Sequence, residues 1–80
     1  MLHARQDYNE RIQDEADLIP DEEPVLLLRA QDELACEAAA YYAWLCRRHQ
    51  VKDVAQRIED HSILMKDWPI KKLPDVPEGM

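Results

Sequence analysis

Apolar side chains recur at three- and four-residue spacing over two long stretches of the chain. Within residues 33–49 the repeating positions are Leu34, Ala35, Ala38, Ala39, Tyr42, Leu45, Cys46 and His49. Within residues 54–67 they are Val54, Ala55, Ile58, Ser62 and Met65, with His61 and Leu64 widening the stripe. This spacing follows one face of an α-helix and predicts two amphipathic helices. Because the connection around residues 50–52 is short, we expect an antiparallel helical hairpin.

Residue types at the ends of these stretches indicate where the two helices begin and end. Asp32 has the chemistry of an N-cap for the first helix. Asp53 and Gln56 have the spacing of a capping box, which predicts that the second helix starts at about residue 54. Pro69 disfavours helical geometry at the residue before it, so the second helix should end at about Asp67.

A run of four apolar residues, 25–28, precedes the hairpin and predicts a short strand. Such a run suits a strand covered on both faces, and its backbone groups need a partner. Three partners are open: the residues before the strand, the tail after Trp68, and the same segment of a second copy. A second copy would also bury more surface in a small protein, so we expect a homo-oligomer.

These elements divide a single domain into three segments. Residues 1–24 form an acidic extended leader, in which residues 5–16 have room for a turn or two of helix. Residues 25–68 form the strand and the hairpin, and residues 69–80 form an extended tail spaced by prolines. The predicted fold class is mainly α, with an antiparallel two-helix hairpin preceded by an extended arm and one short strand.

Charge is distributed unevenly along the 80 residues, whose formal net charge is -7. Residues 1–24 contain eight acidic and two basic side chains, whereas residues 25–80 contain nine acidic and eight basic ones. A nearly neutral body lacks the clustered Lys and Arg face that binds duplex DNA through its phosphates. We therefore expect no direct contact with duplex nucleic acid, and an acidic leader that is able to bind a basic partner.

Apolar runs in this chain are short. None approaches the roughly 20 residues that a membrane-spanning helix needs, and no signal-peptide core follows Met1. These features predict a soluble cytoplasmic protein without a membrane partner. Cys36 and Cys46 lie on one predicted helix about 15 Å apart, too far for a disulfide, so we expect free thiols.

Several catalytic and cofactor-binding classes lack the residues they need. Gly79 is the only glycine, which excludes phosphate-binding loops and dinucleotide fingerprints. Ser62 is the only serine, there is no threonine, and no nucleophile elbow surrounds it. Cys46 and His49, with Asp60 and His61, lack the paired spacing of a zinc site. We expect a non-enzymatic protein with no catalytic residue, no metal and no cofactor.

Candidate ligand-binding residues gather where the predicted strand meets the first helix. Arg29, Gln31 and Asp32 would emerge beside free backbone N–H groups, an arrangement that binds anions. The tail would bring Lys71 and Lys72 to the same place if it returns to the strand. Rings that can stack on a base are supplied by Tyr41, Tyr42, Trp44 and Trp68. Together these residues predict a site for a nucleotide-sized ligand.

A structural interpretation of the same residues stays open beside the ligand site. Arg29 would then pair with the carboxylates of the leader or with Glu33. Asp32 would cap its helix, and the aromatic rings would fill the core. In the leader, the acidic runs would form a solvated face rather than a pair of catalytic carboxylates.

Three segments of the chain resemble small proteins encoded by tailed bacteriophages and prophages. They are residues 8–14, residues 19–32 and residues 68–72. The most specific part is the block EPVLLLRAQD at residues 23–32, in which Leu26 stands where the pattern has phenylalanine; the WPIKK sequence at residues 68–72 is the other marker. The resemblance implies a phage accessory protein in the cytoplasm of the host cell, and it implies no reaction.

We hypothesise that this protein counters host immunity by sequestering a nucleotide-derived immune signal between subunits. Arg29 and Lys71 or Lys72 would bind phosphates, and Tyr41 or Trp44 would stack on the base. Gln31 and Asp32 would recognise the ribose or the base. Two alternatives remain: an acidic inhibitor that occupies the nucleic-acid groove of a host defence complex, and a small regulatory adaptor without a ligand.

Overall fold

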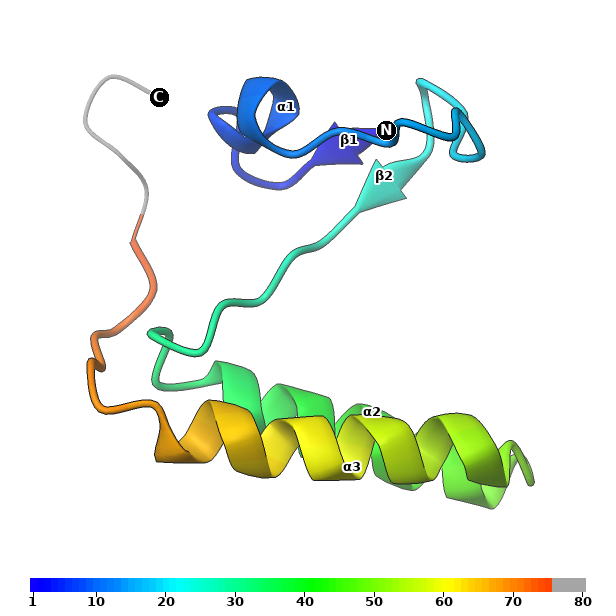
Figure 1. The fold of residues 1–80 in the computed structure, drawn as a ribbon, viewed down its shortest axis with the longest axis vertical. Helices are drawn as coiled ribbons and strands as arrows, with labels where there is room; N and C mark the ends of the chain where they lie inside the picture. The colour runs from blue at the N-terminus through cyan, green and yellow to red at the C-terminus, as the bar shows by residue number, and fades with distance from the viewer. Residues whose placement is uncertain (76–80) are drawn as a thin grey trace. The chain divides into compact units, whose positions relative to one another are not determined.

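The computed structural model describes residues 1–75, which belong to two compact units. Met1–Leu27 and Asp75 form the N-terminal unit, and Leu28–Pro74 form the helical unit. Figure 1 shows the elements in chain order as β1, α1, β2, α2 and α3. Helices make up most of the regular structure, so the predicted mainly α fold is confirmed.

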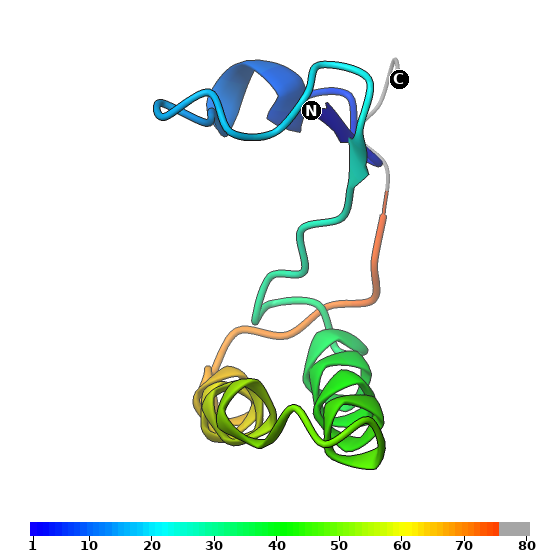
Figure 2. The same ribbon diagram turned by 90° about the vertical axis from the view of Figure 1, so that its right-hand side faces the viewer.

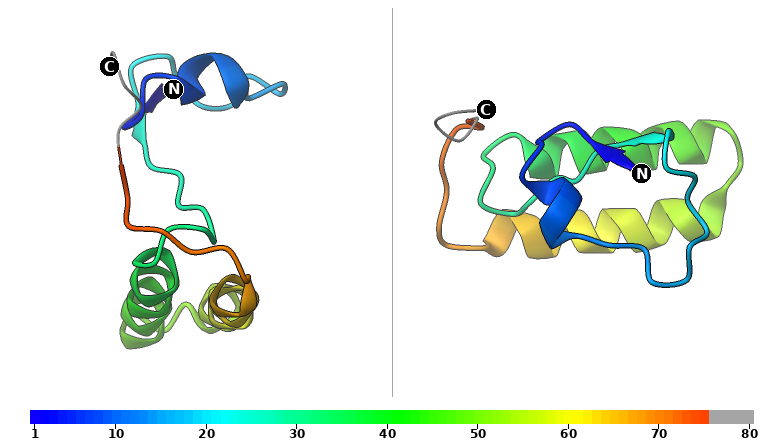
Figure 3. Two further views of the ribbon diagram at one scale, coloured as in Figure 1. Left: turned by 90° about the vertical axis from the view of Figure 1, so that its left-hand side faces the viewer. Right: turned by 90° about the horizontal axis from the view of Figure 1, so that it is seen from above.

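The helical unit is an antiparallel hairpin. Helix α2 spans Ala35–Arg48 and helix α3 spans Lys52–Asp67. The two lie side by side in every view (Figures 1, 2 and 3), and Figure 1 shows that they run in opposite directions. The predicted hairpin is therefore confirmed, and α3 ends at the predicted residue because Trp68 adopts the extended backbone that a following proline requires.

The turn between the helices places Gln50 in a left-handed conformation with φ of 62°. The Val51 N–H donates to the Cys46 carbonyl at 2.8 Å, and the Gln50 N–H donates to the Arg47 carbonyl at 3.0 Å. These are the two bonds of a Schellman motif, which usually has glycine at the left-handed position. A chain with its one glycine elsewhere makes this turn with glutamine instead.

The helix starts differ from the predicted caps. Helix α3 begins two residues before residue 54, and no side chain caps it, so the capping box at Asp53 and Gln56 is wrong. Helix α2 begins at Ala35 rather than at residue 33. Asp32 bonds to the Leu34 N–H within the preceding turn, at 2.8 Å, instead of capping the helix itself.

Small side chains fill the seam between the two helices. Its buried residues are Ala35, Ala43 and Cys46 from α2, and Ala55, Ser62 and Met65 from α3. The buried Ser62 hydroxyl donates to the Glu59 carbonyl at 2.7 Å, which satisfies it within its own helix. Because the seam consists mainly of small residues, the helices bury almost none of their large apolar side chains.

The predicted apolar stripes were partly wrong as a result. Ala43 is buried although the α2 stripe omitted it, whereas Tyr42 and Leu34 of that stripe are exposed. On α3, His61 and Leu64 do not widen the buried face, because both are exposed. The face with the smallest residues allows the closest approach of two helices, and this determined which residues were buried.

The N-terminal unit contains a two-stranded parallel sheet and one short helix. Strand β1, Leu2–His3, pairs with strand β2, Pro24–Val25, in the register Leu2 to Pro24 and His3 to Val25. The short helix α1 spans Tyr8–Arg11. Of the three possible partners, the leader itself therefore pairs with the predicted strand. That strand is shorter than predicted, since residues 26–28 lie outside regular secondary structure.

The tail after α3 has no helix and a single bridge within its described part. Asp32 and Lys72 form an isolated parallel bridge inside the helical unit. The predicted extended tail continues to residue 80, and its last five residues lie outside the described part of the chain. Across residues 1–75, no helix has the length and apolar character needed to cross a membrane.

Candidate functional site

Two segments that are distant in the sequence meet at the ends of the hairpin, and we call this place the junction. It consists of residues 29–34 and residues 68–72. The Lys72 N–H donates to the Gln31 carbonyl at 2.7 Å, and the Glu33 N–H donates to the Lys72 carbonyl at 2.8 Å. The tail therefore does return beside Gln31 and Asp32, held there by backbone hydrogen bonds.

Lys71 fastens the junction through its ammonium group. Its Nζ donates to the Ala30 carbonyl at 2.8 Å and also to the Met65 carbonyl. Met65 lies in the last turn of α3, where its carbonyl also accepts from the Trp68 N–H at 3.3 Å and the helix dipole favours a cation. Lys71 thus connects the segment before α2, the end of α3 and the tail. Its ammonium group is occupied by hydrogen bonds to backbone carbonyls.

Asp32 closes the turn that leads into α2. Its Oδ1 accepts from the Leu34 N–H at 2.8 Å, its own N–H donates to the Arg29 carbonyl at 2.9 Å, and its carbonyl accepts from the Ala35 N–H at 3.0 Å. These bonds give the carboxylate a local structural role, in accordance with the frequent use of aspartate in turns.

Arg29 is exposed at the start of this turn. Within the described part of the chain its guanidinium makes no ion pair and no side-chain hydrogen bond. The alternative in which Arg29 pairs with Glu33 is therefore not found in the described chain. A guanidinium in this state is able to bind an external carboxylate or phosphate through two parallel bonds.

The outer face of α2 has a stack of side chains that we call the aromatic ladder, formed by Tyr41, Trp44 and Arg48. The Tyr41 and Trp44 ring centroids are 5.6 Å apart with an interplanar angle of 26°. The Arg48 Cζ atom lies 5.0 Å from the centre of the Trp44 ring. Spacings of three and four residues place all three side chains on one face. The Tyr41 residue is 61% exposed, so the ladder lies outside the core.

A shallow hollow lies beside the ladder, between α2 and α3. It is lined by Ala40, Ala43, Trp44, Arg47 and Glu59. The Arg47 guanidinium pairs with the Glu59 carboxylate and also donates to the Gln56 Oε1 atom at 3.2 Å. One wall of this hollow is therefore an interhelical ion pair and the other is an indole ring.

The seven predicted ligand-binding residues divide into two groups in the structure. Those at the junction or its start are Arg29, Gln31, Asp32, Lys71 and Lys72, and those on the outer face of α2 are Tyr41 and Trp44. Sequence reasoning did not select Arg48 for the site. The four-residue spacing from Trp44 was the signal available for it, because residues i and i+4 are neighbours on a helix.

In the N-terminal unit, charged side chains surround a buried tyrosine. The Arg5 Cζ atom lies 4.6 Å, and the Arg11 Cζ atom 5.5 Å, from the centre of the Tyr8 ring. Arg5 donates to both carboxylate oxygens of Asp7, from Nε at 3.0 Å and from Nη2 at 2.7 Å. These hydrogen bonds from Arg5 lower the pKa of Asp7 below its ordinary value of 3.8, and the same bonds raise the pKa of Arg5.

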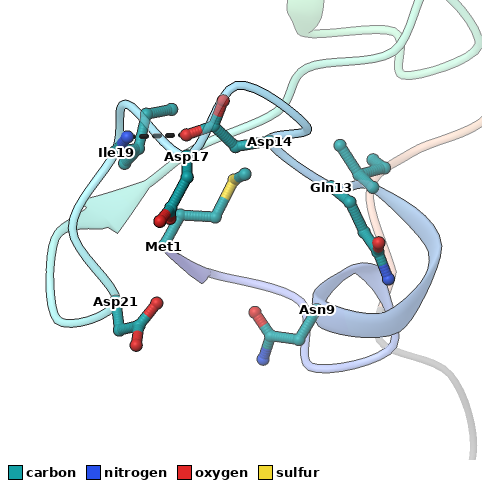
Figure 4. Close-up of a pocket in the computed structure, with 8 residues that line it drawn as sticks. Met1, Asn9, Gln13, Asp14, Asp17, Ile19 and Asp21 are labelled. Carbon is teal, nitrogen blue, oxygen red and sulfur yellow. Dashed lines mark hydrogen bonds between the residues drawn. The ribbon is translucent and has the colours of Figure 1, made fainter.

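An acidic hollow lies in the same unit (Figure 4). Its lining residues are Met1, Asn9, Ile12, Gln13, Asp14, Asp17, Ile19 and Asp21. The Asp14 Oδ2 atom accepts from the Ile19 N–H at 2.6 Å, so this carboxylate holds the loop closed. Across residues 1–75 no group of three or more His, Cys, Asp or Glu side chains is arranged to hold a metal ion. The hollow therefore has a negatively charged lining that includes Asp14, Asp17 and Asp21.

Comparisons of the chain with protein-family models, with curated proteins and with solved structures find no match. The resemblance to small phage proteins thus stays a prediction from residues 8–14, 19–32 and 68–72. Two exposed features of the helical unit are not needed by the hairpin: the guanidinium of Arg29, which has no ion pair within residues 1–75, and the aromatic ladder.

Replacing Lys71 with methionine should destabilise the helical unit by about 1.5–3 kcal/mol, because two backbone carbonyls lose a charged donor. The free energy of unfolding, measured by urea titration followed by circular dichroism, checks this value. Lys52→Met is the matched control, since Lys52 is an exposed lysine at the first position of α3, and its effect should stay within about 0.5 kcal/mol. Equal effects of the two substitutions would contradict the role given to Lys71.

The carboxyl of Asp7 should titrate below pH 3.8 in an NMR pH titration, because Arg5 stabilises its charged form. The stability that this pair adds is present above the unfolded pKa and is lost as the pH falls through the lower folded pKa. Arg5→Gln should return the midpoint toward 3.8. Arg11→Gln should move it less, since Arg11 approaches Asp7 at 3.5 Å through one nitrogen. A wild-type midpoint at or above 3.8 would exclude this arrangement.

Proposed function

We propose that this protein is a non-enzymatic, self-associating phage protein that counters host immunity by sequestering a nucleotide-derived signal. The observation that supports it most is the aromatic ladder on α2. Tyr41 and Trp44 present stacked, exposed rings, and the Arg48 guanidinium lies against one of them. Every nucleobase has a face that stacks on an aromatic ring, and a neighbouring guanidinium binds phosphate.

The roles of the residues in the proposed site differ from those predicted from the sequence. Lys71 and Asp32 have structural roles at the junction, so the phosphate-binding cation beside the rings is Arg48, at the opposite end of α2 from Arg29. Trp44 is the central residue of the ladder, because it contacts both the Tyr41 ring and the Arg48 guanidinium. A ligand with a base and phosphates matches this combination of an aromatic surface and free positive charge.

Self-association is supported by the thin core. None of the large side chains of the described chain is fully buried, and the buried residues are three alanines with single cysteine, methionine, serine and tyrosine residues. Large apolar side chains remain exposed on both helices and in the tail, among them Leu64, Ile70 and Leu73. A small protein with so little buried apolar area gains stability when a second copy covers such side chains.

Calorimetry of the full chain against a panel of cyclic and ADP-ribose-type nucleotides tests this function. At least one should bind, and Trp44→Ala should weaken that binding about 5- to 150-fold, because stacking contributes about 1–3 kcal/mol per base. Trp68→Ala is the matched control, since Trp68 is 50% exposed and Trp44 is 49% exposed. Trp68→Ala should leave the affinity unchanged. Absence of binding by the whole panel would reject the proposal.

A second function, inhibition of a host defence complex by an acidic surface, is supported by the hollow in the N-terminal unit. Asp14, Asp17 and Asp21 line it beside the amides of Asn9 and Gln13 (Figure 4). These grouped carboxylates are negatively charged, as the phosphates of a nucleic acid are. A basic groove that binds nucleic acid would attract them.

Replacing both Asp17 and Asp21 with asparagine should abolish binding to a basic partner while leaving the loop intact. Asp14 is kept because it bonds to Ile19, and asparagine tolerates the positive φ of 55° at Asp17. The matched control replaces Asp53 and Asp67 of α3 with asparagine, which changes the net charge equally. The readout is plaque formation on host cells that have the immune system. Plaques should form with the control, which still counters immunity, and should be lost with the test variant, which no longer does. If the test variant counters immunity like wild type, the acidic surface is not the functional one.

A further inference from the structure

We propose that residues 24–29 bind the same segment of a second copy as an antiparallel strand pair, about a twofold axis at Leu26. This inference deepens the self-association of the proposed function and rests on it. It specifies the surface, the register and the charged residues that determine the register. The segment is one continuous stretch of backbone, so the pairing needs nothing from any other part of the chain.

The backbone of this segment has an unused edge. The Leu2 N–H donates to the Glu23 carbonyl at 2.8 Å, so the odd-numbered residues of β2 direct their polar groups toward β1. In a strand the neighbouring residues direct theirs to the opposite edge. In a strand extended through residues 26–28, as the pairing requires, this alternation would place the groups of Pro24, Leu26 and Leu28 on the edge away from β1. No hydrogen bond within the described chain involves the backbone of residues 26–28.

The side chains of this segment are also uncovered. Leu26 is 69% exposed, Leu27 is 41% exposed and Leu28 is 36% exposed. A strand with unpaired amides and exposed aliphatic side chains is the kind of edge that another strand joins. Pairing two copies would convert two two-stranded sheets into one sheet of four strands, which is more stable than an isolated pair of strands.

Backbone alternation restricts the register. In this antiparallel pair, the backbone N–H and C=O groups that face the partner strand must come from even-numbered residues in both copies. Registers shifted by a single residue are excluded, because they oppose even-numbered residues to odd-numbered ones. Centring the pair on Leu26 gives two hydrogen bonds between the Leu26 residues. The Leu28 N–H of each copy then donates to the Pro24 carbonyl of the other. Because proline has no N–H, only the Leu28 carbonyl of each copy lacks a donor at this pair of residues.

Charge selects one of the remaining registers. With the axis at Leu26, Arg29 of each copy lies opposite Glu23 of the other, and Leu27 lies opposite Val25. A shift by two residues in one direction places Arg29 opposite Val25, and a shift in the other direction places Leu27 opposite Glu23. Within residues 1–75, neither Glu23 nor Arg29 makes an ion pair. Two cross-strand ion pairs, related by the twofold axis, therefore stabilise only the register centred on Leu26.

Sedimentation equilibrium of the full chain, without nucleotide and at low ionic strength, tests the pairing. The wild type should dimerise, and Glu23→Arg or Arg29→Glu should each weaken dimerisation at least about tenfold, because each converts both ion pairs into repulsions. The double variant Glu23→Arg with Arg29→Glu should restore it. Glu22→Arg is the control with the same charge change, and in this register it faces no charged residue, so dimerisation should persist.

Mixing the two single variants provides a sharper measurement. A pair made of one Glu23→Arg copy and one Arg29→Glu copy has both ion pairs attractive, so native mass spectrometry should show mainly heterodimers. A monomeric wild type, full dimerisation of either single variant, a statistical mixture of dimers, or an effect of Glu22→Arg equal to that of Glu23→Arg would each overturn this pairing. The assay contains no nucleotide and keeps Trp44, so a failure here is separable from a failure of the calorimetric test of the ladder.

Discussion

The close contact of small side chains between α2 and α3 is the constraint from which the other features follow. Ala43 and Ala55 allow the two helices to approach, and the seam has room for few large residues. Apolar residues that would fill the core of a larger domain therefore remain on the surface. The protein has a stable local architecture and little buried apolar area, a combination that favours binding to another molecule.

Lys71 compensates for part of this thin core. Its ammonium group joins the carbonyls of Ala30 and Met65, two residues on segments that the hairpin alone would not hold together. A charged donor on backbone carbonyls at a helix end is favourable both as a hydrogen bond and through the helix dipole. The same arrangement removes Lys71 from the group of residues that bind ligand phosphates. Arg48 and Arg29 retain guanidinium groups that face solvent.

The proposed activities use different surfaces of one small chain. The aromatic ladder has rings and a cation, which suit a nucleotide. In the N-terminal unit, the acidic hollow has carboxylates, which suit a basic protein. Residues 24–29 have unpaired backbone groups at residues 26–28, and the segment lies between Glu23 and Arg29 of opposite charge, which suits a second copy. Each surface is defined by groups whose polar or apolar character is unsatisfied within the described chain, and this shared property is the physical reason for proposing that each surface binds another molecule.

The sequence by itself determined the local features of this protein. Helical periodicity and the steric effect of Pro69 predicted both helices and the end of α3, because these depend on residues within a few positions of one another. The stacking of Tyr41 on Trp44 follows equally from their three-residue spacing on a helix. Local patterns also selected Arg29, whose guanidinium makes no ion pair within residues 1–75.

Tertiary structure alone decided which faces and charges are used. Ala43 rather than Tyr42 became buried, because the distance between two packed helices depends on the side chains of both. The role of Lys71 depends on Ala30, which lies 41 positions away in the chain. Val25 pairs with residues at the beginning of the leader, and a composition pattern cannot distinguish that partner from the tail or a second copy. These contacts join residues distant in sequence, so their energies depend on the folded arrangement and not on local spacing.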